Sequence, residues 1–438
     1  MTWLRGLARG QGPYLLAVAG QLGLSAFNFL LGFLAIRLLR PGDLGLYSIW
    51  GEIATVAVGL QSALVLMPLT VHVPAAEAAE RRLLVHGLAL VNAAYSAAVL
   101  AAVALTVLLF RAEWIPGDAP TRAAAAAAVA TALLREYPRQ AAFGAGRVRA
   151  ATLMDAIHLG VAASSLGLLL LLLPAWPGRT LFAILAAISG GAAAAGAAGL
   201  VLVRRRGAAP GRAHGLGAYR RVLPEVRWAT AGGFATAMQD RAYVMLLTAL
   251  AGVQAVGVVF AGGFLLRASA VLSLAWSRVA RPRMARFVAT QDVAALDRTL
   301  WTGVGALMAQ HLALSAAILL LWRWVEPLLG RYEGLHLVTL CWIAATTFAQ
   351  FRAALSAALQ AAKDFRFLAW TTVASTTVTL PATLATIFAF GWRTSVLGMA
   401  AGEAVAGAAM LWRWRRVRGR LAALQAPAEA AAVEDAAA

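Results

Sequence analysis

Residues 180–203 read TLFAILAAISGGAAAAGAAGLVLV, and three arginines, Arg204, Arg205 and Arg206, follow directly. The stretch contains no charged side chain, and a helix needs about 20 such apolar residues to cross the hydrocarbon core of a bilayer. Arginines at the end of an apolar run are typical of the cytoplasmic end of a membrane span. The sequence therefore predicts a transmembrane helix here, and the same pattern recurs along the chain.

The composition of all 438 residues supports this prediction. Hydrophobic residues make up 61% of the chain, charged residues make up 13%, and the mean hydropathy is +0.74. A soluble domain carries about 25% charged residues. Too few polar side chains are present to cover a water-facing surface, which excludes an ordinary soluble enzyme. The sequence indicates an all-α polytopic membrane protein.

Apolar runs between charged residues, proline and glycine predict twelve spans, arranged as two lobes of six helices. A basic cytoplasmic linker, 204–221, joins the N-lobe, 1–203, to the C-lobe, 222–420, and an Ala-rich tail, 421–438, is expected to be disordered. The twelve predicted spans are 13–36, 45–72, 83–110, 121–141, 151–174, 180–203, 222–248, 254–279, 299–322, 335–358, 367–390 and 394–412.

The charge balance indicates an orientation in the membrane. The chain carries 38 Lys+Arg against 19 Asp+Glu, a net charge of +19. If both termini are cytoplasmic, most of these cations lie in short loops on the cytoplasmic side. Membrane proteins show this excess of Lys and Arg in their cytoplasmic loops. We interpret the positive charge as membrane topology and expect no nucleic-acid binding. The predicted location is the cytoplasmic (inner) membrane of a bacterium, with both termini in the cytoplasm.

Nothing in the sequence indicates catalysis, a cofactor or a metal. Cys341 is the single cysteine, and the six histidines show no metal-ligand spacing. Lys363 is the single lysine, and its surroundings exclude a phosphate-binding loop of the G-x-x-x-x-G-K-[ST] type. The loops are too short to hold a folded catalytic domain. We therefore predict that the chain is not an enzyme, and that any energy comes from an ion gradient, a potential or downstream use of its substrate.

A weak internal repeat relates the two halves. Gly45-Leu46-Tyr47 and Gly257-Val258-Val259 each lie at the start of a span, and Arg179-Thr180 and Arg393-Thr394 each open the last span of a half. The separation between matched segments is nearly constant. Because each half has an even number of spans, the repeats are predicted to be parallel, with the substrate path between the lobes.

The stretch from Ala35 to Ser48, AIRLLRPGDLGLYS, resembles the first loop of polysaccharide-export flippases. These belong to the multidrug/oligosaccharidyl-lipid/polysaccharide exporter superfamily. Residues 240–283 resemble their spans seven and eight, and residues 361–402 resemble their final two spans. The resemblance implies a twelve-helix, two-lobe fold that moves a lipid-linked oligosaccharide, usually on a polyprenyl pyrophosphate, to the outer leaflet by alternating access. We expect a monomer, with membrane lipids and polysaccharide polymerase or export proteins as partners.

Arginines inside the spans are the candidate headgroup ligands. Arg267 and Arg278 lie close to one face of the predicted eighth span, and Arg241 and Arg352 lie in the seventh and tenth. Arginine pairs bidentately with phosphate, so we predict that these residues hold the pyrophosphate. Two alternatives remain. Arg278 could instead extend to the membrane surface as an anchor, and Arg352 could form part of a cytoplasmic gate or act as an anchor.

Four carboxylates inside the spans are candidates for ion coupling or for structural ion pairs between helices: Asp240, Glu52, Asp155 and Glu403. Asp155 shares a helical face with His158, so the two could relay a proton or form a helix-end pair. The sequence leaves these interpretations open.

Polar residues on single helix faces are candidates for lining a cavity. They are Gln21, Ser25 and Asn28 in the first span, Thr55 in the second and Thr376 in the eleventh. The alternative is helix packing through small residues and interhelical hydrogen bonds.

A drug exporter and a membrane-embedded enzyme are the alternatives to a flippase. A cation-coupled drug exporter of the same fold is expected to place carboxylates in its cavity, whereas arginines inside spans favour an anionic substrate. A membrane-embedded enzyme needs convergent nucleophilic, acid–base or metal-binding groups, and the sequence contains no such cluster.

Overall fold

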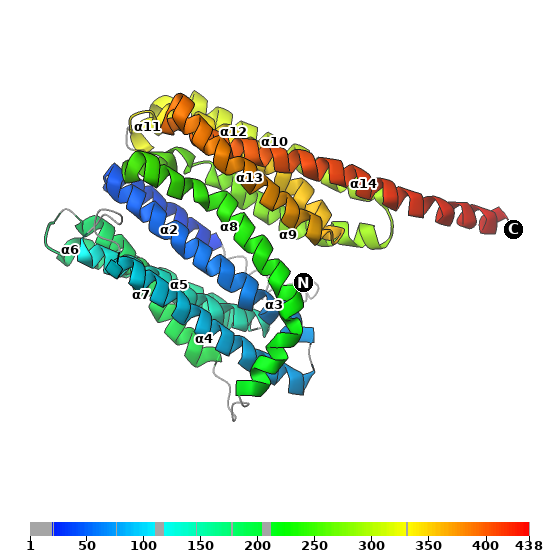
Figure 1. Ribbon diagram of the computed structural model, residues 1–438, viewed down its shortest axis with the longest axis horizontal. Coiled ribbons are helices and arrows are strands. Elements are labelled where there is room, and N and C mark those ends of the chain that lie inside the picture. Colours follow the sequence, from blue (N-terminus) through cyan, green and yellow to red (C-terminus); the bar gives the residue numbers. More distant parts are fainter. Residues whose placement is uncertain are drawn as a thin grey trace, which may run out of the picture. The chain divides into compact units, whose positions relative to one another are not determined.

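The computed structural model describes residue 20 and residues 22–75, 77–109, 118–145, 147–176, 178–203, 212–329 and 332–437. Within these residues the chain is all-helical and contains no β-strand. It forms two compact units, Met1–Phe234 and Ala235–Ala438, and the division lies inside α8 (Figure 1). The all-α class predicted from the sequence is confirmed.

The helices of the first unit follow the predicted order of spans. They are the helix Leu22–Leu38, α2 (Pro41–Gln61), the π-helical turn η1 (Ser62–Leu66), α3 (Met67–Ala75), α4 (Ala78–Leu109), α5 (Ala119–Gly144), α6 (Val148–Leu172), α7 (Arg179–Val203) and the first part of α8 (Arg212–Gly263).

The second unit contains the rest of α8, in which a non-helical backbone at Gly252 separates two helical parts, and the helices that follow it. They are α9 (Arg267–Ala289), α10 (Val293–Leu320), α11 (Trp322–Leu329), α12 (Leu335–Ala361), α13 (Phe365–Phe390), the 3₁₀ turn η2 (Trp392–Thr394) and α14 (Val396–Ala437). Among the described residues of both units, nine helices are long and apolar enough to cross a membrane, and Leu22–Leu38 is a shorter apolar helix.

Capping residues explain several helix boundaries. Asp118 precedes α5 and accepts hydrogen bonds from the Thr121 backbone N–H and the Trp176 indole N–H, both at 2.9 Å. Partial burial opposes ionisation of Asp118, but these hydrogen bonds outweigh it and hold its pKa below the usual range. Asp292 caps α10 in the same way through the Ala295 N–H, at 2.9 Å.

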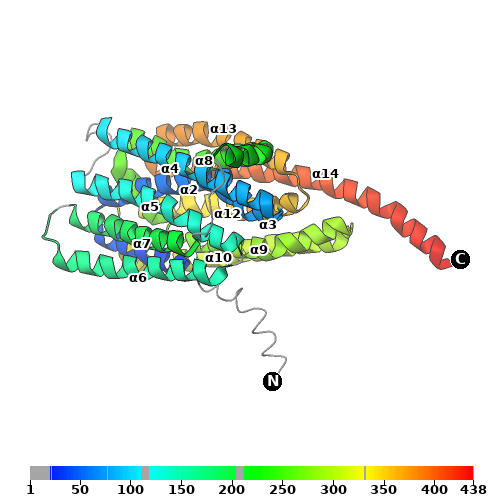
Figure 2. The ribbon, with the colours of Figure 1, turned by 90° about the horizontal axis from the view of Figure 1, so that it is seen from below.

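The two units share one pattern of helix contacts. In the first unit α7 packs against α5 and α6, while α2 and α4 pack against α5. In the second unit α14 packs against α12 and α13, while α9 and α10 pack against α12. Figure 2 shows α5, α6 and α7 side by side. The matching contacts agree with the parallel repeat predicted from the sequence.

Three segments differ from their predicted form. The predicted eighth span, 254–279, is not one continuous helix, because α8 ends at Gly263 and α9 begins at Arg267. Part of the predicted linker 204–221 is helical, since α8 begins at Arg212. Residues 421–437, for which we predict disorder, continue α14 as helix. Their alanine content favours this, because alanine has the highest intrinsic helix propensity.

Glycines allow α13 and α14 to pack closely. A Cβ atom on Gly402 would overlap the Thr379 hydroxyl and lie 3.0 Å from the Ser375 carbonyl oxygen. The Ser375 hydroxyl donates a 2.8 Å hydrogen bond to the Gly402 carbonyl. Small residues at such crossings bring helix backbones together and replace the hydrophobic effect as the source of association inside a bilayer.

This packing predicts that the same substitution, Gly→Ala, changes stability differently at two positions of α14. Gly402→Ala should lower stability by about 1–3 kcal/mol, because the added methyl overpacks the contact with α13. Gly419→Ala is the matched control, since no atom lies within 4 Å of its Cβ position. It should be neutral or stabilising by up to about 1 kcal/mol. Thermal unfolding of both purified variants measures this, and equal midpoints would contradict the close packing.

Candidate functional site

The predicted eighth span is interrupted near its middle. Residues Phe264, Leu265 and Leu266 form turns between α8 and α9. The backbone there makes shorter-range hydrogen bonds: the Arg267 N–H donates to the Phe264 carbonyl at 3.2 Å, and the Ser269 N–H donates to the Leu266 carbonyl at 3.0 Å. Inside a membrane, backbone groups released by such a break need partners from neighbouring helices.

Side chains of α12 provide partners for carbonyls at the end of α8. The Trp342 indole N–H donates to the Val259 carbonyl at 2.8 Å, and the Thr339 hydroxyl donates to the Gly262 carbonyl at 3.2 Å. Glycines make this approach possible. A Cβ atom on Gly263 would lie 2.6 Å from the Trp342 ring, closer than real Cβ atoms approach. These contacts therefore hold the end of α8, just before the break, against α12.

Arg267, a predicted headgroup ligand, is the first residue after the break. Its side chain is exposed, and its guanidinium carbon lies 4.3 Å from the centre of the Phe260 ring. Arg241 lies in α8 and Arg278 in α9, but their side chains are outside the described part of the structure.

Arg352 and Glu403, which the sequence assigned to different roles, form an ion pair. Arg352 Nε, on α12, donates to Glu403 Oε2, on α14, at 2.5 Å. The Glu403 side chain is only 5% exposed. Of the two interpretations left open for Glu403, the structure contains the interhelical ion pair. Arg352 is therefore a partner of Glu403 in this conformation.

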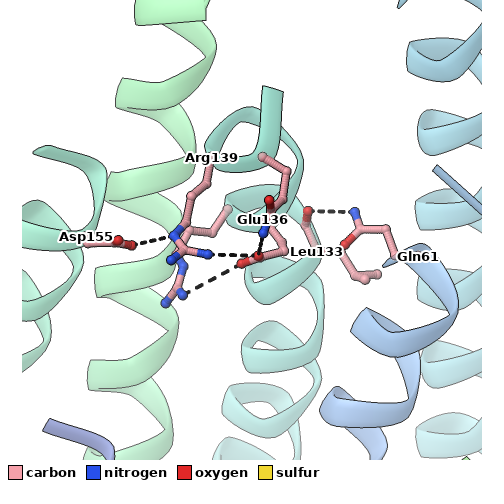
Figure 3. Close-up of polar contacts among 7 residues, drawn as sticks. Gln61, Leu133, Glu136, Arg139 and Asp155 are labelled. Atoms are coloured by element: carbon pink, nitrogen blue, oxygen red, sulfur yellow. Dashed lines mark hydrogen bonds and ion pairs between the residues drawn. The ribbon is translucent and has the colours of Figure 1, made fainter. Parts of the chain in front are cut away.

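A second charged cluster lies between α5 and α6 in the first unit (Figure 3). Arg139 Nε contacts Asp155 Oδ1 at 2.7 Å, and Arg139 Nη1 contacts Glu136 Oε1 at 3.0 Å. Arg135 Nη2 lies 3.8 Å from Glu136 Oε2. Asp155 and His158 are both buried, and Asp155 pairs with Arg139 instead of His158. Sequence reasoning missed Arg139, although its three-residue separation from Glu136 was a signal for a helical ion pair.

The remaining predicted residues lie on several different helices. Glu52 is partly buried on α2, and the side chain of Asp240, on α8, is outside the described part of the structure. Thr55 donates to the Gly51 carbonyl at 2.8 Å, and Thr376 donates to the Thr372 carbonyl at 2.9 Å. In the first helix Ser25 is partly buried and Asn28 is exposed, while Gln21 lies outside the described residues.

A buried polar network in the second unit was also missed. His311, on α10, is 0% exposed and contacts Ser269 on α9 and Thr347 on α12. One turn further along α9, Ser273 donates to Gln350 of α12. The signal was present in the sequence, because a polar residue inside an apolar span needs a partner. In the described part of the chain no group of three or more His, Cys, Asp or Glu side chains could hold a metal.

Comparisons with known proteins identify the fold. No protein-family model matches the sequence, and no curated protein matches it. A solved inward-facing multidrug resistance MATE family transporter of the MOP superfamily is 16% identical, with a TM-score of 0.69 over 91% of this chain and 94% of that one. A MOP superfamily transporter from Pyrococcus furiosus is 15% identical, with a TM-score of 0.66 over 94% and 95% of the two chains.

The VcmN MATE transporter of Vibrio cholerae, solved as a mutant, is 14% identical, with a TM-score of 0.58 over 95% of this chain and 98% of that one. At these identities the likeness shows the fold alone. The chain has the two-lobed, all-helical fold of MATE transporters. Their superfamily is the one that the stretch from Ala35 to Ser48 resembles.

The ion pair between Arg352 and Glu403 predicts a non-additive effect on stability. Arg352→Leu should cost about 3–5 kcal/mol, because it leaves a buried carboxylate without its partner. The double variant Arg352→Leu/Glu403→Leu should recover most of that loss, since neither charge then remains. Thermal unfolding in detergent measures both. A double variant no more stable than the single one would contradict a structural pair.

Proposed function

We propose that this chain is a transporter that moves a polyprenyl-pyrophosphate-linked oligosaccharide from the inner to the outer leaflet by alternating access. Its context is surface-polysaccharide export across the inner membrane of a bacterium, with both termini in the cytoplasm. The fold supports transport in general, because the similar solved structures are of transporters. Fold alone does not identify the substrate, so the argument for an anionic lipid rests on the site.

The exposed Arg267 carries this proposal. It follows a break in the predicted eighth span, and its side chain is accessible on the second unit. Exposure of a guanidinium to lipid near the bilayer centre costs roughly 2.5–3.5 kcal/mol or more, so such residues face the bundle interior or a water-filled cavity. The guanidinium favours an anion, and a pyrophosphate matches its paired donors.

The rest of the substrate fits the same arrangement. The polyprenyl tail can stay in the bilayer while the sugar, which cannot enter hydrocarbon, follows a hydrated path. Arg241 and Arg278 are further candidates for the headgroup, and Ser25, Asn28, Thr55 and Thr376 for lining the path. Asp155, Glu403, Glu52 and Asp240 are candidates for coupling to an ion gradient. Membrane lipids and polysaccharide polymerase or export proteins are the proposed partners of a monomeric transporter.

A cation-coupled drug exporter is the second candidate, because a solved multidrug resistance transporter shares the fold. The solved Pyrococcus furiosus protein is described as having a binding pocket of reverse polarity that suggests a different function. Pocket polarity thus varies within this fold. The arginine at the break of the eighth span favours an anionic substrate for this chain.

Binding to the purified protein in nanodiscs tests the proposal. Polyprenyl pyrophosphate should bind, and Arg267→Ala should weaken its binding by about thirtyfold or more, because truncation of one partner of a charged pair typically costs about 2 kcal/mol or more. Arg281→Ala is the matched control, since Arg281 is also exposed on α9. It should change the affinity by less than about twofold, as expected for a topological arginine.

Two further titrations separate the candidate functions. Arg267→Lys should keep part of the affinity, because it retains the charge and loses the paired donors. A cationic dye should bind poorly. Tight dye binding that is indifferent to Arg267, with no binding of the lipid pyrophosphate, would instead support the drug exporter.

A further inference from the structure

The last predicted span, 394–412, continues as helix in α14 beyond its predicted end, and one side of this continuation is buried. Met410 and Trp414 are each 1% exposed and belong to a cluster of buried residues from α9, α10 and α12. Val417 and Leu421 pack against the same cluster. These four positions lie on one side of the helix and hold it against the rest of the second unit.

Two arginines at the edges of this buried side pair with carboxylates of neighbouring segments. Arg413 Nε donates to Asp364 Oδ2 at 2.5 Å, directly before α13. Arg418 pairs with Asp297, in the first turns of α10. Both carboxylates are largely buried, with the Asp364 side chain 15% exposed and that of Asp297 18% exposed. These pairs fix the rotation of α14 about its axis and so determine which of its side chains face outward.

The outward side of α14 changes from apolar to aromatic to basic along the chain. Val405 is 40% exposed, and Trp412, two turns later on the same side, is 48% exposed. Arg415 and Arg416 follow on either side of the Trp412 position, and both are exposed. The Arg416 guanidinium carbon lies 3.9 Å from the centre of the Trp412 ring. This order is typical of a lipid-facing helix surface, where Trp lies at the membrane interface and Arg extends to the headgroups.

The adjacent helix α13 begins at the same end and shows the same kinds of exposed side chain. Arg366 is exposed in its first turn, Phe365 beside it is 60% exposed, and Trp370 is 59% exposed. The rings of Phe367 and Trp412 lie 6.2 Å apart between their centres, so the aromatic residues of the two helices are in contact. The start of α13 and the end of α14 therefore form one basic and aromatic surface.

The outward arginines of α14 have no counter-charge on the protein. Within the described residues Arg413 and Arg418 each pair with a carboxylate, whereas Arg415, Arg416 and Arg420 form no ion pair. Arg416 and Arg420 lie four residues apart, and like charges at this spacing repel each other on a helix. An anion between the guanidinium groups removes this repulsion, and a phosphate matches their paired donors.

We propose that the surface formed by Trp412, Arg415, Arg416 and the first turn of α13 binds the phosphate headgroup of an anionic phospholipid. The two arginines hold the phosphate, and the acyl chains follow the exposed apolar side of α14 beyond Trp412. This apolar continuation favours a lipid over a soluble acidic partner. With both termini in the cytoplasm, as proposed above, the lipid belongs to the inner leaflet. The site uses no residue proposed to bind the polyprenyl pyrophosphate at Arg267.

Native mass spectrometry of the full-length protein in a neutral detergent measures the affinity of the first bound lipid. Phosphatidylglycerol should bind more tightly than phosphatidylcholine with the same acyl chains, because the second headgroup has no net charge. Arg415→Gln/Arg416→Gln should lower the affinity for phosphatidylglycerol by about twentyfold, since each arginine near an anionic headgroup contributes about fivefold, or roughly 1 kcal/mol. The affinity for phosphatidylcholine should not change. The thermal midpoint without lipid should match that of the wild type, because neither side chain packs against the buried cluster.

Arg283→Gln/Arg286→Gln is the matched control, because it removes the same charge from exposed positions near the end of α9. It should lower the affinity for phosphatidylglycerol by less than about twofold. Equal losses in the two double variants would mean that only overall charge matters and would overturn the site. Glycerol 3-phosphate should not displace the lipid. Its displacement of the lipid at equal concentration, or tighter binding of a soluble glutamate-rich peptide, would overturn the assignment to a lipid. No polyprenyl pyrophosphate is added, so the outcome is independent of the proposed transport function.

Discussion

A backbone carbonyl inside a membrane must have a hydrogen-bond partner. In the second unit this requirement explains the contacts between α12 and the end of α8. The eighth span stops being helical at Phe264, and the carbonyls of Val259 and Gly262 accept from Trp342 and Thr339 of α12. The glycines at the end of α8 allow α12 to come close enough. After the break α9 begins inside the predicted eighth span, with Arg267 as its first residue.

Charges inside the spans follow a similar requirement. In each unit an arginine is paired with a buried carboxylate of another helix: Arg139 with Asp155, and Arg352 with Glu403. Pairing of this kind reduces the cost of a buried charge and sets the register of the two helices. The Arg267 side chain is exposed and lies over the Phe260 ring.

The sequence predicts the all-α fold, the order of spans and the matching halves, because hydrophobic length and arginine position depend on local composition. It does not predict which polar residues meet, since that depends on how each helix is rotated about its axis. Arg352 and Glu403 were predicted to lie inside spans, but their pairing depends on the packing of α12 against α14. The break at Phe264 was missed because its residues are apolar and contain no proline. His311 was missed because a single histidine has no spacing pattern.

The central claim is that the exposed Arg267 faces an aqueous path within the membrane. Its most direct test is the reaction of Arg267→Cys with thiol reagents, in a Cys341→Ala background that removes the single native cysteine. Leu312→Cys, at an exposed apolar position of α10, serves as the lipid-facing reference. The account predicts that a charged, membrane-impermeant reagent modifies position 267 and leaves position 312 unmodified. Modification of position 267 by an apolar, lipid-soluble reagent alone would contradict it.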